Sequence, residues 1–386
     1  MSKRSITRAA LLSSALGLAA APAYAQAVDE TYDTGSGSIH VETFAEGISE
    51  PWGFVQLPDE SWLVTEKEGN LLMVSPDGTV SEPISGTPEV DARDQGGLLD
   101  VQIDPAFAEN RMVYLSFSEP GEGDTNSTAV YRARLSDDGT ALEDGEVIFS
   151  QQPKVESTMH YGSRLVFGDE GHLFVTMGER SHEEFRGQAQ DLDSHLGKIV
   201  RINPDGSVPE DNPFVDEEGA LPEIWSYGNR NVQAAALNPE TGVLWAIEHG
   251  PMGGDELNII EPGNNYGWPL VSFGVEYSGE PINEGESAME GAVDAILTWT
   301  PVIAPSGMIF YQGDAFPEWQ GDIFVGGLAS TALVHVAVDG QTAEEEARYL
   351  EDLGMRIQDV AEGADGMIYV VTDDVDGQML RISPAD

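Results

Sequence analysis

The sequence predicts an all-β protein, a six-bladed β-propeller built from four-stranded antiparallel blades. Helical periodicity is scarce, short apolar β-rich runs dominate, and most of these runs follow a turn-forming segment. Six such runs recur along the chain, roughly one every sixty residues, which suits a four-stranded blade with its loops. Radial repetition of blades protects the edges of the sheets. The alternative is a pair of β-sandwiches or another all-β array.

The runs are rich in β-branched and aromatic residues. They lie at residues 62–65, 112–115, 173–176, 243–246, 323–326 and 368–371. A further strand follows several of them, as at 70–74, before a turn at 75–78. Segments 203–221 and 278–293 are rich in Gly, Pro and acidic residues and are predicted as loops between blades. No linker divides the chain, so we expect a single domain over residues 26–386.

Residues 1–25 have the pattern of a secretory signal peptide. Lys3, Arg4 and Arg8 precede an apolar run over 9–21, and the segment ends in the small-residue sequence Ala-Tyr-Ala. A short membrane anchor is the alternative, but the run is shorter than the roughly 20 residues that a membrane span needs. We therefore expect a periplasmic or secreted protein with no membrane insertion.

The charge of the chain excludes several classes of partner. Asp and Glu number 68 against 18 Lys and Arg, which gives a formal net charge of -50. Loss of residues 1–25 removes three positive charges. Nucleic acids and anionic membranes repel such a protein. With no cysteine, the chain can form neither a disulfide nor a thiolate metal site.

Two polar residues stand out beside predicted strands. His160 lies directly before a strand, and a neutral imidazole is a suitable general base near neutral pH. A structural histidine is the alternative, as it is for His195 and His249. Arg230 lies among small and amide residues, where its paired donors could bind a carboxylate or a quinone oxygen. The alternative for Arg230 is a salt bridge to one of the many acidic residues.

A third candidate is the glycine-rich stretch 248–258, which is followed by 263–269. Glycines let the backbone turn its carbonyl groups inward, and carbonyls with carboxylates are the ligands of calcium. The spacing matches no EF-hand loop, so the local pattern alone supports calcium weakly.

Together these segments resemble the soluble PQQ-dependent sugar dehydrogenases, the glucose/sorbosone dehydrogenase family, and especially its aldose sugar dehydrogenase branch. The resemblance runs from about Pro51 to the C-terminus. It rests on ordered motifs at 95–99, 159–167, 190–193, 197–203, 225–231, 250–258 with 264–269, 304–307 and 356–360.

The resemblance implies a six-bladed propeller that holds PQQ and calcium and oxidises an aldose to a lactone. His160 would take the proton of the anomeric hydroxyl while hydride passes to the quinone, and an external acceptor would then receive the electrons. Arg230 would stabilise negative charge on the quinone oxygen. Glu179, where the family has aspartate, would orient His160.

The resemblance also implies positions that bind the cofactor and the metal. The cofactor positions are Gln95, Arg230, Asn231, Tyr277, Ala329, Ser330, Arg356 and Gln358. Ala329 and Gln358 replace a lysine and an arginine of the family pattern, which removes two cationic contacts.

For calcium, the resemblance implies the carbonyls of Gly250 and Pro251 beside PQQ. It implies Glu256 and Tyr266 at a second, structural calcium. Two other functions stay open, a calcium-dependent lactonase-type hydrolase and a non-catalytic binding propeller that has lost PQQ. The sequence does not indicate the oligomeric state or the preferred sugar.

Overall fold

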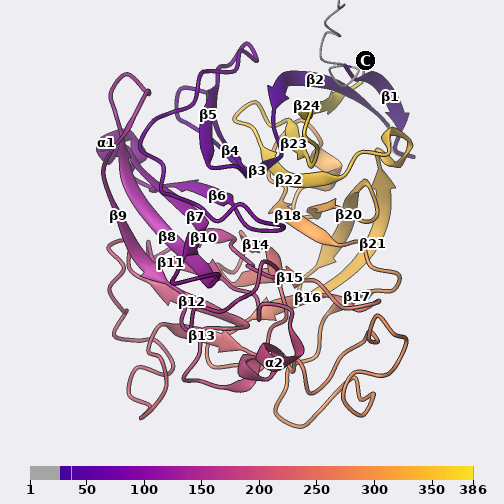
Figure 1. Cartoon of the computed structure of the whole chain (residues 1–386). Coiled ribbons are helices and arrows are strands. Elements are labelled where there is room, and N and C mark those ends of the chain that lie inside the picture. Colours follow the sequence, from indigo (N-terminus) through magenta and orange to yellow (C-terminus); the bar gives the residue numbers. More distant parts are fainter. Residues whose placement is uncertain (1–26, 36, 386) are drawn as a thin grey trace, which may run out of the picture.

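The structure, a computed structural model, describes residues 27–35 and 37–385 and is a six-bladed β-propeller (Figure 1). Each blade is one antiparallel sheet, and the first strand of each blade packs against the first strands of its two neighbours. These six inner strands surround a central channel. The predicted fold class is therefore confirmed, and the predicted secretory segment, 1–25, lies outside the described residues.

The blades follow one another in chain order. Blade 1 contains β3 (Pro51–Gln56), β4 (Trp62–Glu66) and β5 (Asn70–Val74); blade 2 contains β6 (Leu98–Ile103), β7 (Met112–Pro120), β8 (Asn126–Leu135) and β9 (Leu142–Ser150). Blade 3 contains β10 (Leu165–Phe167), β11 (Leu173–Thr176), β12 (Lys198–Ile202) and β13 (Ile224–Tyr227); blade 4 contains β14 (Val232–Leu237), β15 (Leu244–Glu248), β16 (Asp255–Ile260) and β17 (Leu297–Trp299). Blade 5 contains β18 (Pro305–Phe310), β19 (Ile323–Gly327), β20 (Ala332–Asp339) and β21 (Thr342–Tyr349); blade 6 contains β22 (Ile357–Glu362), β23 (Ile368–Thr372), β24 (Gly377–Pro384), β2 (Ser38–Ile48) and β1 (Asp29–Asp33).

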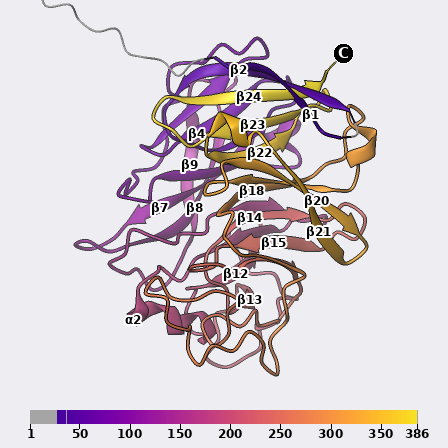
Figure 2. The same cartoon turned by 90° about the vertical axis from the view of Figure 1, so that its right-hand side faces the viewer.

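Blades 1 and 6 depart from the expected four strands. Blade 1 has three strands, and the segment after β5 extends it by an isolated bridge between Val74 and Val80 and by backbone hydrogen bonds from Ser81 and Ile84. Blade 6 has five strands, because β2 from the start of the chain pairs with β24 from its end. The two strands lie side by side in both views (Figure 1, Figure 2). This pairing closes the ring.

The six apolar runs of the sequence fall on the second strand of each blade. These strands read as continuous apolar runs because both of their faces are covered by neighbouring blades. Every residue of β4, β15 and β23 is buried, for example. The core is divided accordingly into six main clusters, one between each pair of adjacent blades. Outer strands such as β21 alternate between exposed and partly buried residues.

Helices in the described residues are short and lie in loops. They are α1 (Phe107–Asn110), α2 (Glu183–Arg186) and 3-10 turns at Gly187–Gln190, Pro317–Trp319 and Glu351–Leu353. Both segments predicted as loops between blades, 203–221 and 278–293, contain no helix or strand.

Candidate active site

The sequence-predicted site residues gather at one mouth of the channel, where the inner strands begin. Gln95, His160 and Arg230 lie in the loops that lead into β6, β10 and β14. The turn between β15 and β16, which carries residues 250–251, reaches the same mouth because β15 runs antiparallel to β14. Segments far apart in the sequence therefore meet around one opening.

His160 and Glu179 form a buried pair at this mouth. Nδ1 of His160 lies 2.6 Å from Oε2 of Glu179, which also accepts the backbone N–H of Ser181 at 3.0 Å. His160 has a φ of 50°, in the left-handed region that non-glycine residues rarely adopt. Gly178 is required beside it, because a Cβ there would lie 2.1 Å from the carbonyl oxygen of His160. This close crossing of two backbone segments positions the carboxylate against the ring.

The surroundings of the pair favour a neutral imidazole beside an ionised carboxylate. Burial lowers the pKa of His160, and the charge of Arg230 adds to this effect, although Glu179 opposes it. Burial acts to raise the pKa of Glu179, but His160, Arg230 and the Ser181 N–H together bring it below its ordinary value. Because a carboxylate only accepts hydrogen bonds, the proton belongs on Nδ1 and leaves Nε2 as the basic nitrogen. Nε2 has no hydrogen-bond partner within residues 27–35 and 37–385.

Two amide side chains hold the backbone on either side of the His160 ring. Oε1 of Gln95 accepts the N–H of His160 at 2.8 Å, and Oδ1 of Asn231 accepts the N–H of Gly162 at 3.0 Å. Their amide nitrogens donate to no group of the described chain, so both keep donors for a ligand.

The guanidinium of Arg230 contacts carbonyl groups and pairs with no carboxylate of the described residues, which overturns the alternative of a salt bridge; only its backbone N–H donates to a carboxylate, that of Glu248. One terminal nitrogen donates to the carbonyls of His249 and Gly250, at 3.0 and 2.8 Å. The other lies 3.5 Å from the hydroxyl of Tyr277, a side chain that is 73% exposed. The guanidinium also lies 5.2 Å from the ring centroid of Trp268. Nε is buried without a partner, so the side chain retains a donor for an anionic or quinone oxygen.

The glycine-rich turn of blade 4 is shaped by Asp255. Its carboxylate accepts the N–H of Gly250 at 2.7 Å and the N–H groups of Ile303 and Ala304, both at 2.8 Å. The carbonyl of Pro251 accepts no hydrogen bond within the described chain. No group of three or more His, Cys, Asp or Glu among those residues could hold a metal ion. A calcium ion at this turn would therefore be held by the backbone carbonyls of Gly250 and Pro251 and by a molecule bound at the mouth.

Deeper in blade 4, two buried acidic groups form no ion pair with any described residue. Glu248 and Glu256 face each other across β15 and β16. Burial raises the pKa of Glu248 to about 7, and burial together with Glu248 raises that of Glu256. The amide oxygens of Asn229 and Asn258 are buried nearby without partners. The hydroxyl of Tyr266 donates to the Ile259 carbonyl at 2.7 Å. The backbone carbonyl of Tyr266 accepts no hydrogen bond from the described residues.

The remaining sequence-predicted positions contribute less to the mouth. Arg356 is exposed, and its Nε donates to Asp373 at 2.7 Å, which holds the guanidinium in place. Ser330 has a buried hydroxyl without a partner. The buried side chain of Gln358 makes no hydrogen bond to the described chain. Ala329 is exposed and offers no polar side-chain group.

Sequence reasoning did not assign a role to Trp268, although it lies in the 264–269 motif. Its ring lies 5.2 Å from the guanidinium of Arg230 and 5.6 Å from that of Arg186. Arg186 in turn pairs with Glu276 at 2.5 Å, which joins α2 to the long loop of blade 4. This contact spans distant segments, so no local pattern could have revealed it.

His195 and His249 have structural partners instead. Nε2 of His195 lies 3.4 Å from Glu223, and Nε2 of His249 lies 3.1 Å from Oε1 of Gln233. Burial lowers the pKa of His249 to about 3, which keeps this ring neutral.

Comparison with known proteins identifies the family. The model of the family described as "Glucose / Sorbosone dehydrogenase" matches residues 48–381 of this chain. The chain belongs to the glucose/sorbosone dehydrogenase family. It is 44% identical over 349 residues to the aldose sugar dehydrogenase YliI of Escherichia coli (strain K12), covering 90% of this chain and 93% of that protein. The family is one of oxidoreductases, and the resemblance seen in the sequence is confirmed.

Solved structures of glucose/sorbosone dehydrogenases have the same fold. The apo-form of the soluble aldose sugar dehydrogenase from Escherichia coli matches with a TM-score of 0.87 at 43% identity, over 90% of this chain and 100% of that one. The PQQ-bound form of the aldose sugar dehydrogenase from Streptomyces coelicolor matches with a TM-score of 0.73 at 28% identity, over 89% and 98%.

Proposed function

We propose that this glucose/sorbosone dehydrogenase oxidises aldose sugars at the anomeric carbon to lactones, with PQQ and calcium, and passes the electrons to an external acceptor. The observation that carries the proposal is the buried His160–Glu179 pair next to Arg230 at one mouth of the channel. Relatives named as aldose sugar dehydrogenases, one of them solved with PQQ, support the choice of substrate and cofactor.

The groups at this mouth fit PQQ, which carries carboxylates and quinone carbonyls. Such a molecule needs hydrogen-bond donors, and the mouth offers several that have no partner in the described chain. They are Nε of Arg230, the Ser330 hydroxyl and the amides of Gln95, Asn231 and Gln358. These residues would hold the cofactor, with Tyr277, Ala329 and Arg356 around them. PQQ, when bound, supplies the acceptor for the hydride that leaves the sugar.

The protein supplies the base for this reaction. Nε2 of His160 is the unoccupied, basic ring nitrogen, and it would take the proton of the anomeric hydroxyl. Once protonated, the imidazolium is stabilised by the carboxylate of Glu179 at 2.6 Å. Arg230 holds a fixed positive charge at the same mouth, where it would stabilise negative charge that develops during oxidation.

Calcium fits two places in blade 4. At the mouth, the carbonyls of Gly250 and Pro251 would bind an ion, although the Gly250 carbonyl also accepts a hydrogen bond from Arg230. In the blade interior, Glu248, Glu256 and two unpartnered amide oxygens supply buried oxygen atoms, and the Tyr266 carbonyl would complete the set of calcium ligands. Oxygen ligands with surplus negative charge are what calcium prefers.

Reconstitution tests the proposal. We expect the purified chain, with PQQ and calcium, to reduce a redox dye in the presence of a panel of aldoses, and a spectral titration to show PQQ binding. The variant His160→Gln should retain PQQ binding and lose dye reduction. Absence of both binding and reduction would contradict the proposal. Lactone hydrolysis without PQQ would instead support the hydrolase.

We further propose that the protein is exported after removal of residues 1–25. Among the described residues, none of the helices combines the length and the apolar character that crossing a bilayer would require. The amino-terminal sequence of the protein recovered from the periplasm or the medium tests this proposal, with Gln26 expected as the first residue.

A further inference from the structure

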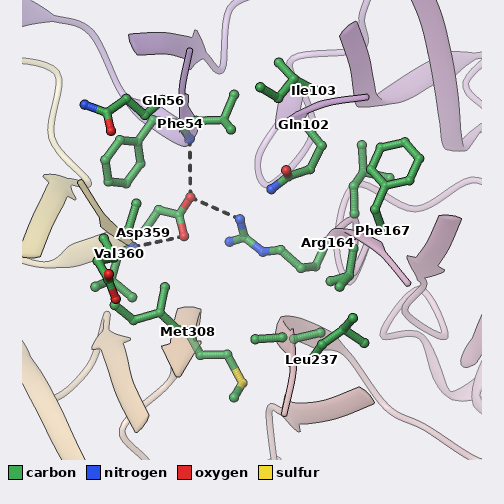
Figure 3. Close-up of a pocket in the computed structure, with 18 of the residues that line it drawn as sticks. Phe54, Gln56, Gln102, Ile103, Arg164, Phe167, Leu237, Met308, Asp359 and Val360 are labelled. Atoms are coloured by element: carbon green, nitrogen blue, oxygen red, sulfur yellow. Dashed lines mark hydrogen bonds and ion pairs between the residues drawn. The ribbon is translucent and has the colours of Figure 1, made fainter. Parts of the chain in front are cut away.

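A cavity of about 700 Å³ opens at the opposite mouth of the channel from the candidate active site. It is lined by the later halves of the inner strands, whereas His160 and Arg230 lie where those strands begin. Figure 3 shows its labelled residues arranged as a ring, with the side chain of Arg164 reaching into the middle. The six inner strands contribute, in order, Phe54, Gln102, Phe167, Leu237, Met308 and Val360. A cavity of this size accommodates a small molecule.

Arg164 closes the floor of the cavity. Its guanidinium is buried, lines the cavity and lies in the middle of the ring (Figure 3). Its Nη1 donates to Asp100 at 2.9 Å and to Asp359 at 3.1 Å. The guanidinium carbon lies 4.8 Å from the ring centroid of Trp52. Carbonyl groups complete its surroundings. The partners of Arg164, one from each of the other five blades, are Trp52, Asp100, Gln233, Ser306 and Asp359.

The floor holds two acidic groups against one basic group. Two buried carboxylates, Asp100 and Asp359, share the single guanidinium of Arg164. Among the residues that line the cavity, Arg164 is the only basic one, and Glu362 adds a further carboxylate near the rim. Both carboxyl groups also accept backbone N–H groups, Asp100 from Val101 and Leu165 and Asp359 from Phe54 and Val360. Burial raises the pKa of Asp100 to about 7, so above that pH the floor carries one negative charge more than Arg164 balances, and a cation placed against it relieves that cost. The overall charge of the chain also disfavours anionic ligands.

The walls suit the organic part of such a cation. Phe54, Trp62 and Phe167 line the cavity, and the faces of aromatic rings attract ammonium groups. The side chain of Gln102 points into the cavity (Figure 3) and makes no hydrogen bond within the described chain. We propose that this cavity binds a small organic ammonium ion, with its charge toward Asp359 and its apolar part against the aromatic walls. The site uses none of the residues assigned to sugar oxidation.

Calorimetric titration of the full chain, without PQQ or sugar, tests this site. The probe is 2-phenylethylammonium chloride, and its neutral counterpart is 2-phenylethanol. We expect one ammonium ion to bind per chain, and the alcohol to bind at least about tenfold more weakly because it lacks the charge. Equal affinity for the two compounds would overturn the proposal.

Two variants locate the binding. Gln102→Lys places a competing ammonium group in the cavity, and Met308→Trp fills its volume, so each should abolish binding of the probe. Gln341→Lys makes the same change of charge on an exposed turn and should leave binding intact. Thermal unfolding verifies that each variant is folded, and the two cavity variants act by independent means. Binding that survives both of them, or that Gln341→Lys also removes, would show attraction to the acidic surface and overturn the proposal.

Discussion

Replacement of Glu179 by glutamine tests the role of the buried pair. The substitution preserves size but replaces the charged acceptor that lies 2.6 Å from Nδ1 of His160. A hydrogen bond to a charged group contributes about 1.5–3 kcal/mol, and the imidazolium that forms in the reaction depends on it. At about 1.4 kcal/mol per factor of ten, we expect kcat to fall about 10- to 150-fold.

The pH profile separates this role from a merely structural one. Because Glu179 raises the pKa of His160 against the effect of burial, its removal lowers that pKa further. The base must be neutral to accept a proton, so the acid limb of kcat/KM should move to lower pH in Glu179→Gln. The plateau above it should remain below that of the wild type.

Dye reduction by the reconstituted enzyme from pH 4.5 to 9 measures both effects. Glu223→Gln is the matched control, since Glu223 lies 3.4 Å from His195 in the same blade and outside the site. It should leave kcat and the profile unchanged. An unaltered kcat in Glu179→Gln, or an acid limb that moves to higher pH, would refute the reasoning.

Three further predictions follow from other parts of the structure. Arg230→Lys loses the planar fork that donates to the Gly250 carbonyl, and kcat/KM measured by dye reduction should fall about 100-fold; an unchanged value would contradict its electrostatic role. Calcium should raise the Tm of the chelated protein by calorimetry, and Glu256→Gln should reduce this increase; an equal increase would exclude Glu256 as a ligand. Burial raises the pKa of Asp100 to about 7 in the folded protein against 3.8 ordinarily, so its contribution to stability is lost as pH rises from about 4 to 7. In Asp100→Asn, chemical denaturation should show a smaller decrease in the free energy of unfolding over this pH range than in the wild type. An equal decrease would contradict the assignment of the effect to Asp100.

The sequence revealed the second strands of the blades because both of their faces are buried. Outer strands such as β9 and β21 are exposed on one side and read as polar, so they gave no comparable signal. The strand count of blade 6 also escaped prediction, because β2 and β24 pair across nearly the whole chain.

His160 and Arg230 were singled out from short segments and Glu179 from the family resemblance, and the structure places the three side chains together at one mouth. Their roles in catalysis stay a prediction. The surroundings of Arg164 were not predicted, although it lies in the His160 segment, because its partners come from five other blades. The Arg186–Glu276 pair was missed for the same reason.

The pairing of β2 with β24 also determines when folding can finish. Ile48 is in register with Gly377, so the final sheet needs both ends of the chain at once. When the chain appears with its amino terminus first, β2 is present early. It has no partner strand until β24, near the carboxyl terminus, has appeared as well. Joining ends so distant in sequence is slow. If residues 1–25 direct export and the chain crosses the membrane unfolded, the ring can close only after the last strand has crossed.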